Sequence, residues 1–243
     1  MGLDLNKIYN QDCLEGMKRI PDKSVDMILC DLPYGTTRNK WDSIIPLNLL
    51  WEQYERIIKD NGAIVLTAQT PFDKVLGESN LKLLKYEWIW GKSKATGHLN
   101  AKKMPLKEHE NILVFYKKLP KYNPQGIMKK KVLTIRKGRN NGSNYGKSSK
   151  DAIQEFENYP KSILRFPSEG KTIHPTQKPV PLFEYLIKTY TNEGETVLDN
   201  CMGSGTTAIA CLNINRNFIG FEKDETYWKL ATERIEKHLS NRG

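Results

Sequence analysis

The chain alternates between short apolar runs and longer amphipathic stretches. Runs bounded by polar or turn-forming residues predict strands over residues 7–9, 25–30, 63–68, 86–90, 111–116, 196–199 and 217–222. Apolar residues that recur every three or four positions predict helices over residues 46–59, 71–84, 179–191 and 227–238. Shorter helices are predicted near residue 14 and over residues 208–212.

A strand, a helix and a second strand follow one another between Val25 and Ala68, which is the sequence form of a parallel, right-handed βαβ unit. The helix of this unit is expected to stop at Asn61-Gly62. Predicted helices and strands alternate again after residue 179. We therefore predict an α/β protein whose chemistry lies beyond the carboxyl ends of its strands.

The regular pattern dissolves between Leu119 and Ser168, where Gly, Asn, Ser and Lys dominate. We interpret residues 118–170 as an insertion into a domain formed by residues 1–117 and 171–243. Its aromatic residues are interleaved with basic ones, which suits phosphate contact and base stacking, and they are Tyr122, Tyr145, Phe156 and Tyr159. Disorder is the alternative interpretation for residues 138–150.

The distribution of charge along the chain is uneven and indicates a polyanionic partner. The chain of 243 residues has a net charge of +10, yet residues 91–150 alone carry +14 and the remainder −4. A concentrated basic region beside a mildly acidic body is typical of proteins that bind a polyanion, most often nucleic acid. The alternative is a lysine-rich surface that serves solubility alone.

Composition excludes several classes. The chain has no apolar stretch of the roughly 20 residues that a membrane span needs and no basic, apolar signal segment at its start, so we expect a cytoplasmic protein. The cysteines show neither a CxxC pair nor a zinc-ligand spacing, and they are Cys13, Cys30, Cys201 and Cys211. We expect reduced, mostly buried thiols and no metal site.

One predicted strand ends in a turn that carries chemistry. The run from Val25 to Cys30 leads into Asp31-Leu32-Pro33-Tyr34-Gly35, which places a carboxylate and an aromatic ring at the edge of the sheet. The polar residues 36–42 that follow suit a lid over a bound substrate. Cys30 is better explained as a small apolar residue closing the strand than as a nucleophile, because no histidine lies near it in the sequence.

A glycine-rich turn follows the predicted strand over residues 196–199. Gly203, Gly205 and Ala208 fit G-x-G-x-x-[G/A], and Glu222 lies nineteen residues after Gly203 at the end of the next strand. Small residues let the backbone approach a nucleoside ligand, and the acid accepts hydrogen bonds from ribose hydroxyls. The alternative is a tight strand-to-helix turn with a solvated glutamate.

The length of the chain after this turn favours one class of cofactor over another. A dinucleotide needs a second mononucleotide-binding half, and 21 residues follow Glu222. S-adenosylmethionine needs one half, and its cationic sulfonium suits a loop beside Asp199, with Asp12 or Asp31 nearby. We therefore expect S-adenosylmethionine. We also expect the strands that end at Cys30 and Asp199 to be neighbours, so that both turns face one crevice.

Together these motifs resemble the β-class of amino-group DNA methyltransferases, in which the catalytic tetrapeptide comes first and the cofactor loop last. The family's Asp-Pro-Pro-Tyr corresponds to Asp31-Leu32-Pro33-Tyr34, and its His-Pro-Thr-Gln-Lys-Pro is unchanged over residues 174–179. Its glycine motif corresponds to residues 199–207. The resemblance covers residues 6–117 and 159–239. It implies a Rossmann-like, doubly wound, mostly parallel sheet of seven strands in permuted order.

The resemblance also implies roles for these residues. Asp31 and the backbone carbonyl of Leu32 would accept hydrogen bonds from the reacting amino group, Pro33 would stiffen the loop, and Tyr34 would stack on a flipped base. The cofactor would lie among Asp12, Cys13, Lys178, Asp199, Gly203, Ser204, Gly205, Thr206 and Glu222. His174 would be a structural turn residue.

Two residues depart from the family pattern. Leu32 replaces the first proline of the tetrapeptide, which should preserve the carbonyl but loosen the loop. Cys201 replaces the usual phenylalanine of the glycine motif, which is expected to weaken packing against the cofactor.

The expected activity is methylation of adenine N6 at a specific short site in double-stranded DNA, because the tetrapeptide begins with Asp rather than Ser. Cytosine N4 is the alternative, and carbon-5 chemistry is disfavoured because no Pro-Cys pair occurs. An NAD-dependent oxidoreductase and a catalytically inactive DNA-binding protein are the alternatives from other classes. The family also implies nucleoid association, a homodimer and a cognate restriction endonuclease.

Overall fold

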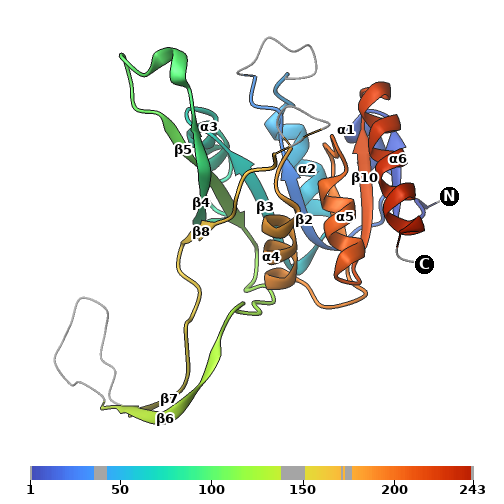
Figure 1. Cartoon of the computed structure of the whole chain (residues 1–243). Coiled ribbons are helices and arrows are strands. Elements are labelled where there is room, and N and C mark those ends of the chain that lie inside the picture. Colours follow the sequence, from blue (N-terminus) through green and yellow to red (C-terminus); the bar gives the residue numbers. More distant parts are fainter. Residues whose placement is uncertain (1, 36–42, 138–150, 171, 173–176, 242–243) are drawn as a thin grey trace. The chain divides into compact units, whose positions relative to one another are not determined.

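A computed structural model describes residues 2–35, 43–137, 151–170, 172 and 177–241 (Figure 1). The predicted lid over residues 36–42, the interval 138–150 with Tyr145, and His174 lie outside the described residues. The chain divides into two compact units, one formed by Met1–Asn123 with Ser162–Gly243 and the other by Pro124–Lys161. The smaller unit begins later and ends earlier than the expected insertion over residues 118–170.

A central sheet forms the frame of the larger unit. In spatial order its strands are β1 (Lys7–Asn10), β10 (Asn217–Glu222), β9 (Thr196–Asp199), β2 (Val25–Asp31), β3 (Ile58–Ala68), β5 (Lys107–Phe115), β4 (Leu84–Thr96) and β8 (Ile163–Arg165). Among the described strands of this sheet, β5 alone runs antiparallel to its neighbours. The permuted, mostly parallel sheet is confirmed, with eight strands where seven were expected.

Helices cover both faces of this sheet (Figure 1). They are α1 (Cys13–Met17), α2 (Leu47–Ile57), α3 (Phe72–Ser79), α4 (Val180–Tyr190), α5 (Thr206–Asn213) and α6 (Glu225–Ser240). Met27 and Leu29 of β2 face the core that holds α4, α5 and α6, whereas Ile28 and Cys30 face the core that holds α1, α2 and α3. Burial on both faces explains why β2 is a continuous apolar run. Judged by length and hydropathy, none of the described helices could span a bilayer.

The boundary between α2 and β3 differs from the prediction. The helix ends at Ile57, and Asn61-Gly62, predicted to stop it, lies within β3. A Cβ atom at Gly62 would stand 2.8 Å from the carbonyl oxygen of Asp26 on β2. The glycine is therefore explained by close approach of two strands.

The segment that sequence patterns left irregular contains three strands. β6 (Met128–Arg136) and β7 (Ala152–Glu157) form an antiparallel ribbon in the smaller unit, whereas β8 pairs in parallel with β4 in the larger unit. Tyr122, predicted to contact nucleic acid, makes an edge contact with Tyr190 of the larger unit at 6.2 Å between ring centroids. These strands were missed because they lack an alternating apolar pattern or are only three residues long.

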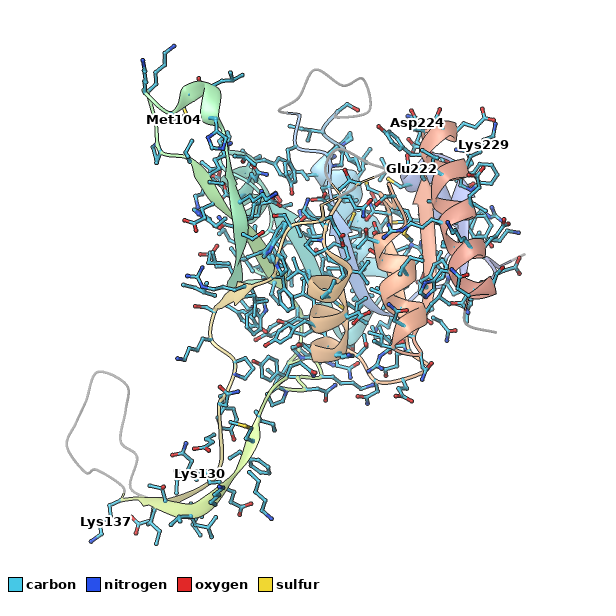
Figure 2. All side chains as sticks on the ribbon, viewed as in Figure 1. Met104, Lys130, Lys137, Glu222, Asp224 and Lys229 are labelled. Carbon is cyan, nitrogen blue, oxygen red and sulfur yellow. The ribbon has the colours of Figure 1, made fainter. Side chains whose placement is uncertain are left out.

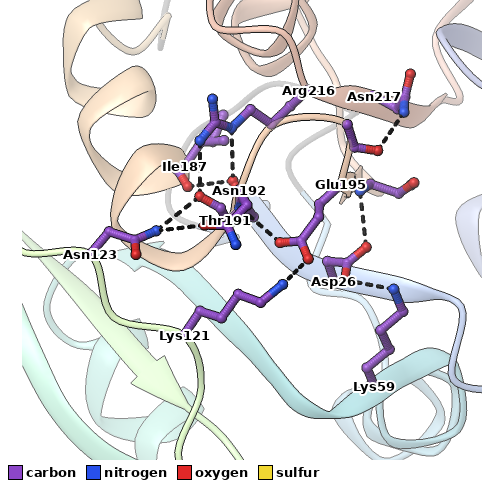
Figure 3. Close-up of polar contacts among 12 residues, drawn as sticks. Asp26, Lys59, Lys121, Asn123, Ile187, Thr191, Asn192, Glu195, Arg216 and Asn217 are labelled. Atoms are coloured by element: carbon purple, nitrogen blue, oxygen red, sulfur yellow. Dashed lines mark hydrogen bonds and ion pairs between the residues drawn. The ribbon is translucent and has the colours of Figure 1, made fainter.

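A polar cluster anchors the chain where it leaves the larger unit (Figure 3). Lys121 pairs with Glu195, and the Asn123 side chain donates to the Thr191 carbonyl at 3.1 Å. The Arg216 guanidinium donates to the same carbonyl at 2.9 Å. Residues 121–123 of the larger unit are therefore fixed to the loop after α4.

Candidate active site

The two predicted turns meet at one edge of the sheet. Met27 and Ile28 of β2 pair with Val197 and Leu198 of β9, which confirms that the strands ending at Cys30 and Asp199 are neighbours. A cavity of about 520 Å³ lies beyond their carboxyl ends, a size ordinary for a small-molecule site. The predicted residues that line it are Asp12, Cys13, Asp31, Leu32, Pro33, Tyr34, Lys178, Asp199, Gly203, Ser204, Thr206 and Glu222.

Gly205 is absent from this lining. It is the N-cap of α5, with φ of +79°, and a Cβ atom there would stand 3.3 Å from the Ala231 side chain. Its place is therefore explained by the turn into α5 and by close packing against α6. Residues 43–46 and Tyr227 also line the cavity, although none of them was predicted as a site residue.

Asp31, the last residue of β2, is held through both carboxylate oxygens. The Tyr34 hydroxyl donates to Oδ1 at 2.6 Å, and the Thr67 hydroxyl of β3 donates to the same oxygen. Lys178 donates from Nζ to Oδ2 at 2.5 Å. The carboxylate is thereby fixed in orientation at the edge of the cavity.

Lys178 joins this carboxylate to a second one. Its ammonium is almost fully buried and lies 3.4 Å from Glu110 of β5. Burial alone would lower the pKa of Lys178, but the two carboxylates Asp31 and Glu110 outweigh it and leave the pKa raised. The lysine is therefore a permanent cation in the floor of the site. Lys178 also lines the cavity shared by the predicted cofactor residues.

Glu110 was not among the predicted site residues. It is buried, pairs with Lys92 of β4, and accepts a hydrogen bond from Gln69 at 2.9 Å. Burial acts to raise the pKa of Glu110, but Lys178 and Lys92 reverse that effect and lower it. Asp31, Lys178, Glu110 and Lys92 thus form a row of alternating charge. The sequence feature that could have identified Glu110 is an acidic residue directly before a predicted apolar strand.

The tetrapeptide is held by packing as well as by polar contacts. The Tyr34 ring stacks on Phe72 of α3, with 5.4 Å between centroids. Burial, followed by the charge of Asp31, raises the pKa of Tyr34, so its hydroxyl stays protonated and donates to Asp31. Leu32 is 3 % exposed and belongs to the core beneath α1, α2 and α3. This packing restrains the loop at the position where the family has proline.

Glu222 and Asp12 border the other side of the cavity. Each oxygen of Glu222 accepts a backbone N–H, from Gly203 at 2.7 Å and from Asp224 at 2.8 Å (Figure 2 shows Glu222 and Asp224 at the end of β10). Asp12 caps α1 by accepting from the Leu14 N–H at 2.9 Å. A carboxylate oxygen can accept two hydrogen bonds, so both acids retain capacity for ligand hydroxyl or amino groups.

Asp199 is buried beneath the glycine turn. It accepts hydrogen bonds from the Thr207 hydroxyl at 2.5 Å and from the Cys201 N–H at 3.0 Å. Burial raises the pKa of Asp199 to about 6. A cation placed beside this carboxylate would lower that pKa and be stabilised in return.

Three cysteines that are distant in sequence come together here. The Asn200 side chain donates from Nδ2 to Cys13 Sγ at 3.7 Å and to Cys201 Sγ at 3.5 Å, and its Oδ1 accepts from the Tyr54 hydroxyl at 2.5 Å. Burial raises the pKa of Cys30 to about 12, which suits a packing residue. All four thiols are free, and the described residues contain no cluster of metal-ligating side chains.

Comparisons with known proteins agree on one family. The N6_N4_Mtase model, described as a DNA methylase, matches residues 25–233. The type II methyltransferase M.BglII of Bacillus subtilis is 32% identical over 255 residues, which cover 93% of this chain and 68% of the relative. The DNA adenine methyltransferase YhdJ of Escherichia coli strain K12 is 27% identical over 256 residues, which cover 97% and 84%.

Solved structures show the same architecture. The complex of M1.HpyAVI with SAM has a TM-score of 0.65 and 26% identity, covering 94% of this chain and 98% of that one. The cytosine-N4-specific PvuII DNA methyltransferase has a TM-score of 0.72 at 15% identity, covering 98% and 92%, and is a likeness of fold alone.

Proposed function

The chain belongs to the N6/N4 DNA methylase family as an S-adenosylmethionine-dependent DNA methyltransferase, and we propose that it methylates adenine N6 at a specific site in double-stranded DNA. The observation that carries this proposal is the placement of Asp31 at the edge of one cavity with the glycine turn and Glu222. An acid at the first position of the tetrapeptide favours adenine. The relative YhdJ is named as an adenine methyltransferase.

The donors and acceptors of the cavity fit the cofactor. We propose that Glu222 accepts hydrogen bonds from the ribose hydroxyls and Asp12 from the adenine amino group, using the free acceptor capacity of each carboxylate. The methionine end would lie near Asp199, Gly203, Ser204 and Thr206, with Cys13 also beside the cofactor. When bound, the cofactor supplies an electrophilic methyl group.

Asp31 and the Leu32 carbonyl orient the reacting amino group. The lone pair of an exocyclic amino nitrogen is delocalised into the ring, so the nitrogen is a weak nucleophile. Two acceptors aimed at its hydrogens favour a pyramidal nitrogen whose lone pair points along the line of displacement. The nitrogen loses one proton after transfer, and Asp31 is placed to accept it. Pro33 keeps the two acceptors aimed, and the cavity-lining Tyr34 ring would stack on the flipped base.

Lys178 serves Asp31 in this proposal rather than the methionine end of the cofactor. Its ammonium is already shared between Asp31 at 2.5 Å and Glu110 at 3.4 Å. A fixed cation that donates a hydrogen bond to Asp31 keeps the carboxylate oriented as an acceptor.

The basic ribbon of the smaller unit is the proposed target-recognition element. β6 carries Lys129, Lys130 and Lys131, and a two-stranded ribbon has dimensions that a DNA major groove admits. A second copy of the chain and a cognate restriction endonuclease are further partners, proposed on the family resemblance and on the type II relatives.

The test is methyl transfer from labelled S-adenosylmethionine to unmethylated plasmid DNA, followed by mass spectrometry of the digested nucleosides. We expect N6-methyladenosine, and N4-methylcytosine in its place would establish the alternative base. Asp31→Ala should abolish transfer while S-adenosylhomocysteine still raises the melting temperature. Stabilisation by NAD instead would favour an oxidoreductase. Absence of transfer by the native protein would favour a DNA-binding protein.

A further inference from the structure

The hairpin of β4 and β5 extends beyond the catalytic edge of the sheet. Asp31 pairs with Thr67 on β3, and Thr67 pairs with Ile112 on β5, so these residues form one row across the sheet. β5 begins five residues earlier, at Lys107, which pairs with Thr96. At about 3.3 Å per residue, the strand continues roughly 17 Å past that row. The tip, with Met104, stands farther out still (Figures 1 and 2).

The tip combines exposed apolar and cationic side chains. Leu99 is 101% exposed and Met104 is 52% exposed. The exposed lysines around them are Lys94, Lys102, Lys103 and Lys107. None of these lysines forms an ion pair with a described residue, whereas Lys18 and Lys229 on the surface helices pair with Glu15 and Glu225. The hairpin lysines therefore remain available to an external anion.

The tip is also ordered by its own backbone. Gly97 adopts φ of +92° and starts a short 3₁₀ turn, His98–Asn100. The Lys103 and Met104 N–H groups donate to the Asn100 carbonyl at 2.8 and 3.0 Å. Leu99 is thus presented on a hydrogen-bonded turn rather than folded back onto the protein. Single exposed leucines are common, but one held on a hydrogen-bonded turn, with exposed lysines on both sides of it in the hairpin, indicates a charged partner that also accepts an apolar side chain.

We propose that the tip of this hairpin, residues 94–107, is a DNA-contacting element of the larger unit that acts beside the target base. The lysines bind phosphates, and Leu99 enters the base stack to fill the space left when the target base is flipped. The inference rests on the proposed function, because it takes double-stranded DNA as the partner. A protein partner would need an acid opposite each unpaired lysine as well as an apolar patch.

The phosphate contacts are tested by removing two lysines. Lys102→Gln with Lys103→Gln removes two charges at the tip, and Lys82→Gln with Lys85→Gln removes two exposed charges near the opposite end of β4. Binding to a plasmid DNA fragment is measured across salt concentrations. The slope of log K against log salt is negative, and the tip variant should make it shallower by about 1.8, or 0.9 for each lost phosphate contact, whereas the control should leave it unchanged.

The insertion of Leu99 is tested separately. Leu99→Ser should lower the turnover of methyl transfer about tenfold and reduce the fluorescence gain of 2-aminopurine placed at the methylated position. That position is found by sequencing DNA methylated by the native protein. Leu81→Ser is the matched control, since Leu81 is 66% exposed just before β4. Both variants should keep the native salt slope and the native response to S-adenosylhomocysteine.

Equal salt slopes and equal turnover for tip and control variants would overturn the inference. A Leu99→Ser variant with native DNA binding and turnover but an altered oligomeric state would instead make the tip a protein interface. Failure of the native protein to methylate any DNA would count against the proposed function, while the salt titration would still test the hairpin as a DNA contact.

Discussion

Lys178 donates a hydrogen bond to Asp31 at 2.5 Å, although the two residues are 147 positions apart in the chain. Lys178 belongs to the segment 174–179 that matches the family motif, and Asp31 ends β2. Their pairing joins two motifs that the sequence shows separately. It makes the orientation of the Asp31 carboxylate depend on the placement of Lys178 just before α4.

Lys178→Met should therefore impair transfer more than cofactor binding. It leaves Asp31 without its cation and Glu110 with one cation fewer, and breaking a buried pair costs about 3–5 kcal/mol of stability. We expect at least about a tenfold loss of turnover, with the dissociation constant of S-adenosylhomocysteine nearly unchanged. Calorimetry and single-turnover kinetics separate the two quantities.

Lys178→Arg is the matched control, because it keeps the charge and should recover part of the turnover. Loss of cofactor affinity with turnover preserved at saturation would contradict this role and would place Lys178 at the methionine end.

Glu110 is predicted to act as a positioning residue through Lys178. Glu110→Gln keeps the volume but removes the charge that faces the ammonium at 3.4 Å. Turnover should fall about tenfold while KM for the cofactor stays the same, because Glu110 does not line the cavity. Glu108→Gln, at an exposed position two residues earlier on β5, should behave as the native protein. An equal loss in both variants would indicate a general effect on the hairpin.

The convergence of the two motifs could be predicted because each follows an apolar strand. Parallel strands end at the same edge of a sheet, so Asp31 and Gly203 are expected to lie close together if their strands are neighbours. The pairing of Lys178 could not be predicted in the same way. It depends on the position of a residue that lies in no periodic pattern of the sequence.

Glu110 and β8 were missed for other reasons. An acid at the start of a strand is most often solvated, and its burial becomes visible only when Lys92 and Lys178 are seen on either side. β8 is three residues long, which is too short to show an alternating pattern. It is a strand because it pairs in parallel with β4. Both depend on contacts between distant parts of the chain.

Leu32 should matter for stability rather than for chemistry. Its side chain is buried in the core beneath α1, α2 and α3, whereas the proposed mechanism uses its backbone carbonyl. Leu32→Ala should lower the free energy of unfolding by about 2–5 kcal/mol and leave turnover at a permissive temperature within a few-fold of native. Denaturant unfolding and methyl-transfer assays measure the two effects. A large loss of turnover at full folding would show that the side chain, and not the carbonyl alone, supports the reaction.

Asp199 should make cofactor binding depend on pH. Its folded pKa of about 6 lies above the ordinary value of an aspartate side chain, so the native state takes up a proton as pH falls through 6. Without ligand, this raised pKa adds up to about 3 kcal/mol of stability below pH 4, and that contribution is lost as pH rises from 4 through 6. Neutralising it also removes an attraction for the cationic sulfonium. The affinity for S-adenosylmethionine should fall relative to that for uncharged S-adenosylhomocysteine as pH drops below 6.

Asp199→Asn provides the control for this dependence. It mimics the protonated acid, so the ratio of the two affinities should be low and independent of pH between 5 and 8. Unfolding midpoints of the native and variant proteins, measured without ligand, should converge at low pH and separate at pH 7 in favour of Asp199→Asn. A native affinity ratio that does not change across this range would show that Asp199 does not face the sulfonium.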